Sequence, residues 1–162
     1  MKNSQKGFTL IELLAVIIIL AIIALITTPI ILNVVEDSRR SAAEDKAYGV
    51  VDAVRLAYQQ HQMKDSPTQN VEVTVDFTEG ATNRGILGAD TSGENPVKVS
   101  ISGDYPESGT VTVYQQDIQT SSVDGKAHEI GTITVKDLKF GNYICNTIEA
   151  GSSKIKCVRP TN

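Results

Sequence analysis

An apolar run from Phe8 to Leu32 constrains the fold of this chain more than any other feature, and Glu12 is its only ionisable side chain. A bilayer core about 30 Å thick needs roughly 20 helical residues, so the run is long enough to cross a membrane. Seventeen of its side chains are Leu, Ile, Val or Phe, and they favour insertion by about 5 to 10 kcal/mol. Glu12 opposes insertion by at most about 3 kcal/mol, so the sequence predicts a membrane-spanning helix.

The charges that flank the run predict its orientation. Lys2 and Lys6 precede it, whereas Glu36 and Asp37 follow it. Because positive residues favour the cytoplasmic side, we expect the short amino-terminal head inside and the large remainder outside.

Two ordinary interpretations of the run compete with a special one. A secretory signal peptide should end in small residues at a cleavage site, but this run ends in Thr27, Thr28 and Pro29 before two isoleucines. A plain membrane anchor leaves Glu12 unexplained, because a carboxylate in an apolar medium needs a partner. The nearest candidate partner is an α-amino group made by cutting the chain beside it.

The segment Lys6 to Leu14, which reads KGFTLIELL, is followed by the apolar helix with Pro29 inside it. This combination resembles the class III signal of type IV pilins and pseudopilins, closely over residues 1–32 and only in architecture beyond the helix. The resemblance implies that a prepilin peptidase removes residues 1–7 as a leader by cutting after Gly7, and then methylates the new amino terminus at Phe8. It also implies a pilus assembly platform, and a polymer of this chain with other pilins.

Residue chemistry fits that implication. Gly7 lets the backbone approach catalytic groups closely. The freed Phe8 amine of one subunit can meet the Glu12 carboxylate of its neighbour in the filament core, where removing one partner of a buried pair costs about 3 to 5 kcal/mol. Pro29 removes a helical hydrogen bond and predicts a kink or a loosened turn. The resemblance implies melting there during packing, although Ala21 stands where many relatives carry a glycine.

An amphipathic continuation, residues 33–64, is expected beyond the membrane. Apolar or small side chains recur at alternating spacings of four and three, which predicts one stripe along a helix that packs on a sheet. These residues are Ala43, Ala47, Val50, Val54, Ala57 and His61. The predicted helix runs from Phe8 to about His61, and Asp65 to Pro67 end it.

Residues 65–162 are expected to form a β-rich head. Alternating apolar and polar residues predict strands at 71–77, 97–101, 110–113 and 133–135, and a phase shift predicts a bulge at Gly131. Turn-forming residues at 80–93, 103–109 and 121–125 separate them. The sequence thus predicts an α+β fold in which the long amino-terminal helix packs on an antiparallel sheet, as in a pilin roll.

Cys145 and Cys157 are the two cysteines of the chain. An even pair of cysteines outside the cytoplasm fits a disulfide. Closing a loop of this length would stabilise the fold by about 3 kcal/mol in the chain-entropy account. Two reduced thiols remain the alternative. Many pilins close a carboxyl-terminal loop in this way, and Gly151 to Ser153 would form its turn.

No catalytic residue, metal site, cofactor or small-molecule substrate is predicted. His61 and His128 are far apart in sequence, the phosphate-binding loop pattern is absent, and Asp104 and Glu107 lack the spacing of a calcium loop. The formal net charge is −4, and loss of the leader lysines lowers it further. Nucleic acid is therefore an unfavourable ligand despite a short basic strip of Lys154, Lys156 and Arg159.

Together these patterns predict a structural subunit of a surface filament, held first in membrane lipid and then extruded. Such filaments serve adhesion, twitching motility, aggregation or DNA uptake. Two alternatives stay open: a pseudopilin of a type II secretion or competence system, and a membrane-anchored extracellular protein that does not polymerise.

Overall fold

The computed structural model describes residues 7–64, 72–87, 97–114, 121, 125–149, 152 and 154–160 of the 162-residue chain. By its internal contacts the chain divides into two compact units, residues 1–39 and 40–162. The first unit holds the start of the long helix α1. The second holds the remainder of that helix and the strands. Of the predicted leader, Gly7 alone lies among the described residues.

Helix α1 spans Leu10–Lys64, close to the predicted Phe8 to His61. Pro29 lies inside it and does not interrupt it. The predicted helix end, Asp65 to Pro67, lies outside the described residues.

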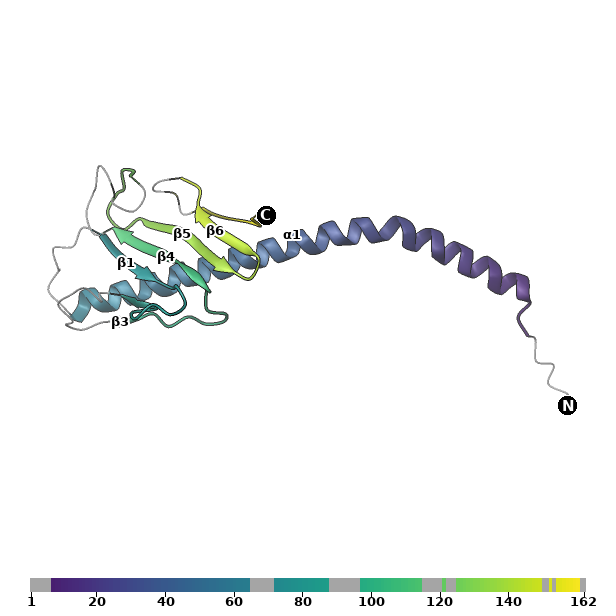
Figure 1. Ribbon diagram of the computed structural model, residues 1–162, viewed down its shortest axis with the longest axis horizontal. Coiled ribbons are helices and arrows are strands. Elements are labelled where there is room, and N and C mark those ends of the chain that lie inside the picture. Colours follow the sequence, from purple (N-terminus) through teal and green to yellow (C-terminus); the bar gives the residue numbers. More distant parts are fainter. Residues whose placement is uncertain are drawn as a thin grey trace. The chain divides into compact units, whose positions relative to one another are not determined.

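The described strands form one five-stranded sheet and one two-stranded pair. The larger sheet is antiparallel with the order β1-β4-β5-β6-β7, and β2 pairs with β3 (Figure 1). One helix on one antiparallel sheet is the predicted α+β architecture. The bounds are β1 Glu72–Asp76, β2 Ile86–Leu87, β3 Val97–Lys98, β4 Ser108–Tyr114, β5 Ile133–Phe140, β6 Tyr143–Thr147 and β7 Ile155–Val158.

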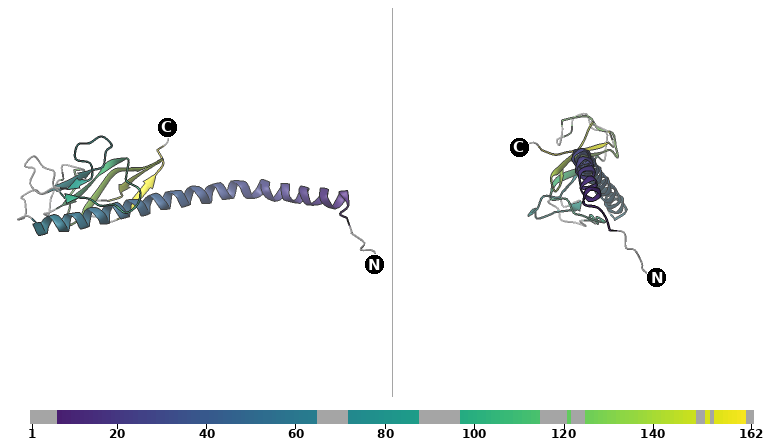
Figure 2. Two further views of the ribbon diagram at one scale, coloured as in Figure 1. Left: turned by 90° about the horizontal axis from the view of Figure 1, so that it is seen from below. Right: turned by 90° about the vertical axis from the view of Figure 1, so that its right-hand side faces the viewer.

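The core of the second unit forms where the helix stripe meets one face of the sheet. Figure 2 shows the sheet lying along this part of α1. Every member of the predicted stripe is buried, from Ala43 to His61. Branched and aromatic side chains of the sheet complete the same cluster, among them Val75, Phe77, Val111 and Leu138. The stripe prediction is confirmed, and burial of this apolar surface is the main force that holds helix and sheet together.

Two glycines shape strand β5 and its partner β4. Gly131 has φ +80° and donates its N–H to Tyr114 O, while Tyr114 N donates to Thr132 O, so two residues oppose one. This confirms the predicted bulge. Gly109 has φ +108°, and a Cβ there would lie 2.5 Å from the carbonyl oxygen of Asp137. That close approach accompanies a second shift of register, which the sequence does not predict.

Several predicted boundaries are wrong in detail. β2 lies inside the segment 80–93 that the sequence predicts as a turn region, and β4 begins at Ser108 inside the predicted turn 103–109. The strand predicted at 97–101 ends at Lys98, although Val99 is still buried. Strand β5 continues to Phe140, well beyond the predicted 135. Residues 122–124 of the last predicted turn lie outside the described residues.

The two cysteines form the predicted disulfide, in a strand hairpin that the sequence does not predict. Cys145 and Cys157 face each other across β6 and β7, with their Cα atoms 4.0 Å apart and both side chains fully buried. Of the predicted turn, Gly151 and Ser153 lie outside the described residues. The disulfide therefore joins the last two strands of the sheet under the helix.

The outer edge of β7 is covered by side chains of α1. Ile155 N donates to Tyr48 Oη at 3.0 Å, and Cys157 N donates to Glu44 Oε1 at 3.2 Å. Glu44 and Tyr48 are one helical turn apart and match the two-residue spacing of the outward N–H groups. An open strand edge is a template for adding foreign strands, so these two contacts both fasten the helix and block that edge.

Candidate functional site

Glu12, the lone carboxylate of the apolar run, is bonded by Thr9 at the start of α1. Thr9 N and Thr9 Oγ1 donate to Glu12 Oε2 at 2.8 and 2.7 Å, and Glu12 N donates to Thr9 Oγ1 at 3.3 Å. Leu13 N donates to Thr9 O at 3.3 Å, so Thr9 is the residue that caps the helix. The arrangement is a capping box, in which the first and fourth residues satisfy each other's backbone groups.

Thr9 supplies part of the partner that the Glu12 carboxylate needs in apolar surroundings. A carboxylate in an apolar medium is costly unless donors surround it. Here a hydroxyl and a backbone N–H point at one of its oxygens, and it lies at the positive end of the helix dipole. The role of Thr9 is not among the sequence-based predictions, although Thr-x-x-Glu before an apolar run is the signature of a capping box.

The predicted cleavage position precedes the cap directly. Gly7 and Phe8 lie before the first residue of α1 and are exposed, with 92% of Phe8 accessible. A Cβ added to Gly7 would meet no atom within 4 Å. Gly7, Phe8, Thr9 and Glu12 thus all lie at or just before the start of α1, and no part of the described chain covers them.

The apolar side chains of α1 that follow this turn are uncovered by the chain's own residues. Between Leu10 and Leu32 the exposed fractions of the large hydrophobic side chains range from 47% at Leu14 to 82% at Leu10. By length and composition, α1 is the one helix of the described residues that is able to cross a membrane. A continuous apolar surface of this size marks contact with lipid or with other protein.

Pro29 lies inside α1 without ending it, and two threonines directly precede it. Thr27 Oγ1 donates to Ile23 O at 2.8 Å, and Thr28 Oγ1 donates to Ala24 O at 2.7 Å. Each hydroxyl adds a second donor to a carbonyl of the preceding turn, whereas the carbonyl that Pro29 leaves without its helical donor is that of Leu25. The predicted melting during packing concerns the polymer and stays a prediction.

The remaining candidate residues lie in structural roles. His61 ends the buried helix stripe, and the ring of His128 stacks on that of Tyr114 with centroids 3.9 Å apart. Within the described residues, no group of three or more His, Cys, Asp or Glu side chains is placed to hold a metal ion.

Asp104 and Glu107, the weak calcium candidates of the sequence, are ion-paired. Lys46 Nζ lies 2.5 Å from Asp104 Oδ2, and Lys139 Nζ lies 2.9 Å from Glu107 Oε2. The hydrogen bond from Lys46 lowers the pKa of Asp104. Hydrogen bonds from Lys139 and from the Gly141 N–H lower the pKa of Glu107. Each carboxylate thus pairs with a lysine from another segment and ties the two segments together.

Comparison with protein families gives a match at the amino-terminal end of the chain. The family model described as prokaryotic N-terminal methylation motif matches residues 2–28. No curated protein and no solved structure matches the chain. The matched segment contains the exposed glycine, the capping box and most of the apolar run.

Proposed function

Because the chain carries the amino-terminal signal of a type IV pilin-like or pseudopilin-like precursor, we propose that it is a structural subunit of a type IV pilus. The precursor is cut after Gly7 by a prepilin peptidase and methylated at Phe8. An assembly platform then extracts the subunit from the membrane into a filament made of this chain and other pilins.

The uncovered apolar half of α1 is the observation that carries this proposal. Side chains from Leu10 to Leu32 are about half exposed or more, and burial stabilises by roughly 25 cal/mol per Å² of apolar area. Lipid supplies that burial before assembly, and neighbouring helices supply it in a filament. A head whose own core is already complete has no need of this helix half, which is thus available for assembly.

The capping box suggests how the Glu12 carboxylate is accommodated both in the membrane and in the filament. Cleavage after Gly7 leaves Thr9 and Glu12 in the chain, so the cap persists in the mature subunit. The new amine belongs to Phe8, the residue just before the Thr9 N–H that already donates to Glu12 Oε2. The second carboxylate oxygen stays available for the amine of a neighbouring subunit, which fixes the register of packing.

The proposed location follows from the same parts. The precursor is a single-pass protein of the inner or cytoplasmic membrane with its amino terminus inside, and the mature subunit is extracellular. The proposal gives the chain a structural role and no catalytic one. It does not choose among adhesion, twitching motility, aggregation and DNA uptake.

Mass spectrometry of the amino-terminal peptide from sheared surface filaments tests the proposal. We expect a peptide that begins with methylated Phe8. A chain that begins at Met1, or one found in membranes and never in sheared material, would contradict a filament role. Processed protein without long surface filaments in the wild type would indicate the pseudopilin alternative instead.

A Glu12→Gln variant tests the pairing step separately. Glutamine keeps the size and the acceptor oxygen for Thr9 but removes the charge that attracts an amine. We expect normal membrane insertion and cleavage with at least a tenfold loss of filaments, and Glu36→Gln serves as a matched control outside the apolar run. Normal filament yield from Glu12→Gln would refute the pairing.

A further inference from the structure

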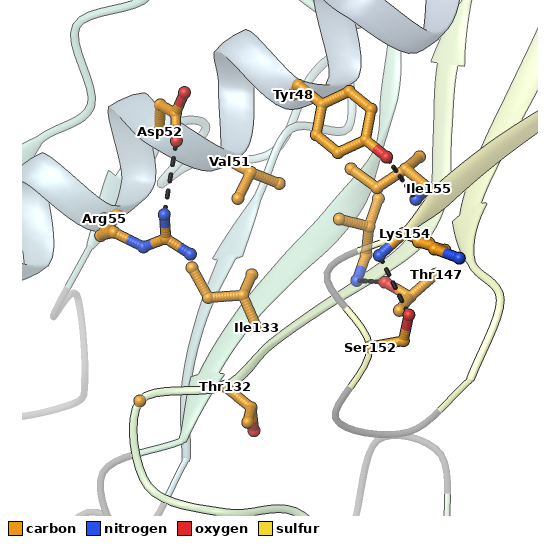
Figure 3. A pocket seen from close by; sticks show the side chains of 12 residues that line it. Tyr48, Val51, Asp52, Arg55, Thr132, Ile133, Thr147, Ser152, Lys154 and Ile155 are labelled. Carbon is orange, nitrogen blue, oxygen red and sulfur yellow. Dashed lines mark hydrogen bonds and ion pairs between the residues drawn. The ribbon is translucent and has the colours of Figure 1, made fainter.

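A pocket of about 420 Å³ lies in the second unit, between α1 and the strands β5, β6 and β7 (Figure 3). It opens because the β5–β6 ladder covers only Leu138 to Phe140 against Tyr143 to Cys145. Before Leu138 the two strands part, and helix residues close the gap from one side.

Part of a strand edge faces this gap. Asp137 N donates to the side chain of Asn146 at 2.6 Å, and Val135 N donates to Thr147 Oγ1 at 2.8 Å. Side chains of β6 thus replace the missing backbone partners. Ile133 lies two residues before Val135 in β5, so its N–H and C=O point to the same side of the strand as those of Val135. Within the described residues, no acceptor is bonded to the Ile133 N–H.

The walls around Ile133 combine apolar and cationic groups. Val51 and Ile155 line the pocket on the helix and β7 sides. Figure 3 shows Arg55 and Lys154 on opposite sides of Ile133. Arg55 contacts Asp52 at 3.5 Å, with half of the Arg55 side chain exposed, and Lys154 is exposed with no acidic partner within the described residues.

We propose that this pocket binds an acidic peptide segment in extended conformation. The N–H and C=O of Ile133 offer the two backbone bonds that an added strand uses, and the apolar walls accept a side chain. Two cations beside a single carboxylate favour a negatively charged segment over a neutral one. This site lies entirely in the second unit, residues 40–162, so it does not depend on whether the chain forms filaments.

Nuclear magnetic resonance of the full ¹⁵N-labelled chain in detergent micelles tests the site directly. The probe is acetyl-Thr-Val-Asp-Val-Thr-amide, and its matched neutral form has Asn in place of Asp. We expect the Ile133 amide proton to move downfield and exchange more slowly with the acidic probe. The Val135 amide, already bonded to Thr147, is the internal control and should move little.

Charge variants separate recognition from simple adhesion. Lys154→Gln should weaken binding of the acidic probe roughly two- to fivefold, which is the effect of losing an exposed charge pair. Lys98→Gln on β3 removes the same charge outside the pocket and should leave binding unchanged. Equal binding of the Asp and Asn probes would overturn the proposal. So would an Ile133 shift produced by sodium acetate alone, or probe-induced shifts confined to residues outside the pocket.

Discussion

Replacing Thr9 by valine should loosen the first turn of α1 without unfolding the head. Valine keeps the shape of threonine but lacks the hydroxyl that donates to Glu12 Oε2 and accepts from Glu12 N. Loss of a threonine cap costs about 0.5 to 2 kcal/mol, typically near 1. Since about 1.4 kcal/mol changes an equilibrium tenfold, local opening should become roughly fivefold more frequent.

Amide hydrogen exchange of the full chain in micelles measures this opening. The amides of Glu12 and Leu13 report it, because both donate to Thr9 in the intact cap. Thr9→Ser keeps a hydroxyl, so the exchange rates of these two amides should stay within about twofold of the wild type. Thr27→Val removes a hydroxyl further along the helix and serves as the control. Equal exchange rates for Thr9→Val and Thr9→Ser would show that the cap contributes nothing, and the assignment of Glu12 to it would be wrong.

Three further predictions concern the second unit, residues 40–162. Tyr48→Phe removes one hydrogen bond to the edge of β7 and should lower the free energy of unfolding by about 1 kcal/mol, measured by denaturant titration; an unchanged midpoint would contradict the edge cap. Reduction of the Cys145–Cys157 disulfide should lower the free energy of unfolding by about 3 kcal/mol in the loop-entropy account. An unchanged free energy of unfolding on adding reductant would refute that account here. Because Lys46 lowers the pKa of Asp104, this ion pair stabilises above the ordinary aspartate pKa of about 4 and is lost as pH falls below it. Lys46→Met should therefore reduce the acid sensitivity of unfolding, and an identical acid midpoint would contradict the ion pair.

Regular patterns account for what the sequence predicts correctly. The helix stripe follows a strict three-and-four spacing, and all of it is buried. Strand β1 alternates cleanly between apolar and polar residues, so its bounds differ from the prediction by one residue at each end. Both signals are periodic over many residues, which is the condition under which pattern and burial agree.

Local irregularity explains the errors. Asp137 has φ 53°, so an extra residue in β5 puts Val135 and Leu138 on the same face at a spacing of three. A period-two search therefore stops at 135. Strand β2 has two residues and no period at all. The pocket depends on where two strands diverge, a property of the register that no single segment of sequence encodes.

Glu12 shows why an apparent conflict in sequence can be resolved by a neighbour three residues away. Removing a lone carboxylate from water costs several kcal/mol, more than one cap returns, so Thr9 alone does not make Glu12 favourable deep in a membrane. Its place in the first turn keeps it near the interface, where the cost is lower. The cap then holds the carboxylate at the helix end, bonded to Thr9, the residue that follows the one whose α-amino group the proposed cleavage would free. In the proposed filament the remaining deficit is met by a charge from another subunit, so the same energy that disfavours Glu12 in a single chain favours correctly registered assembly.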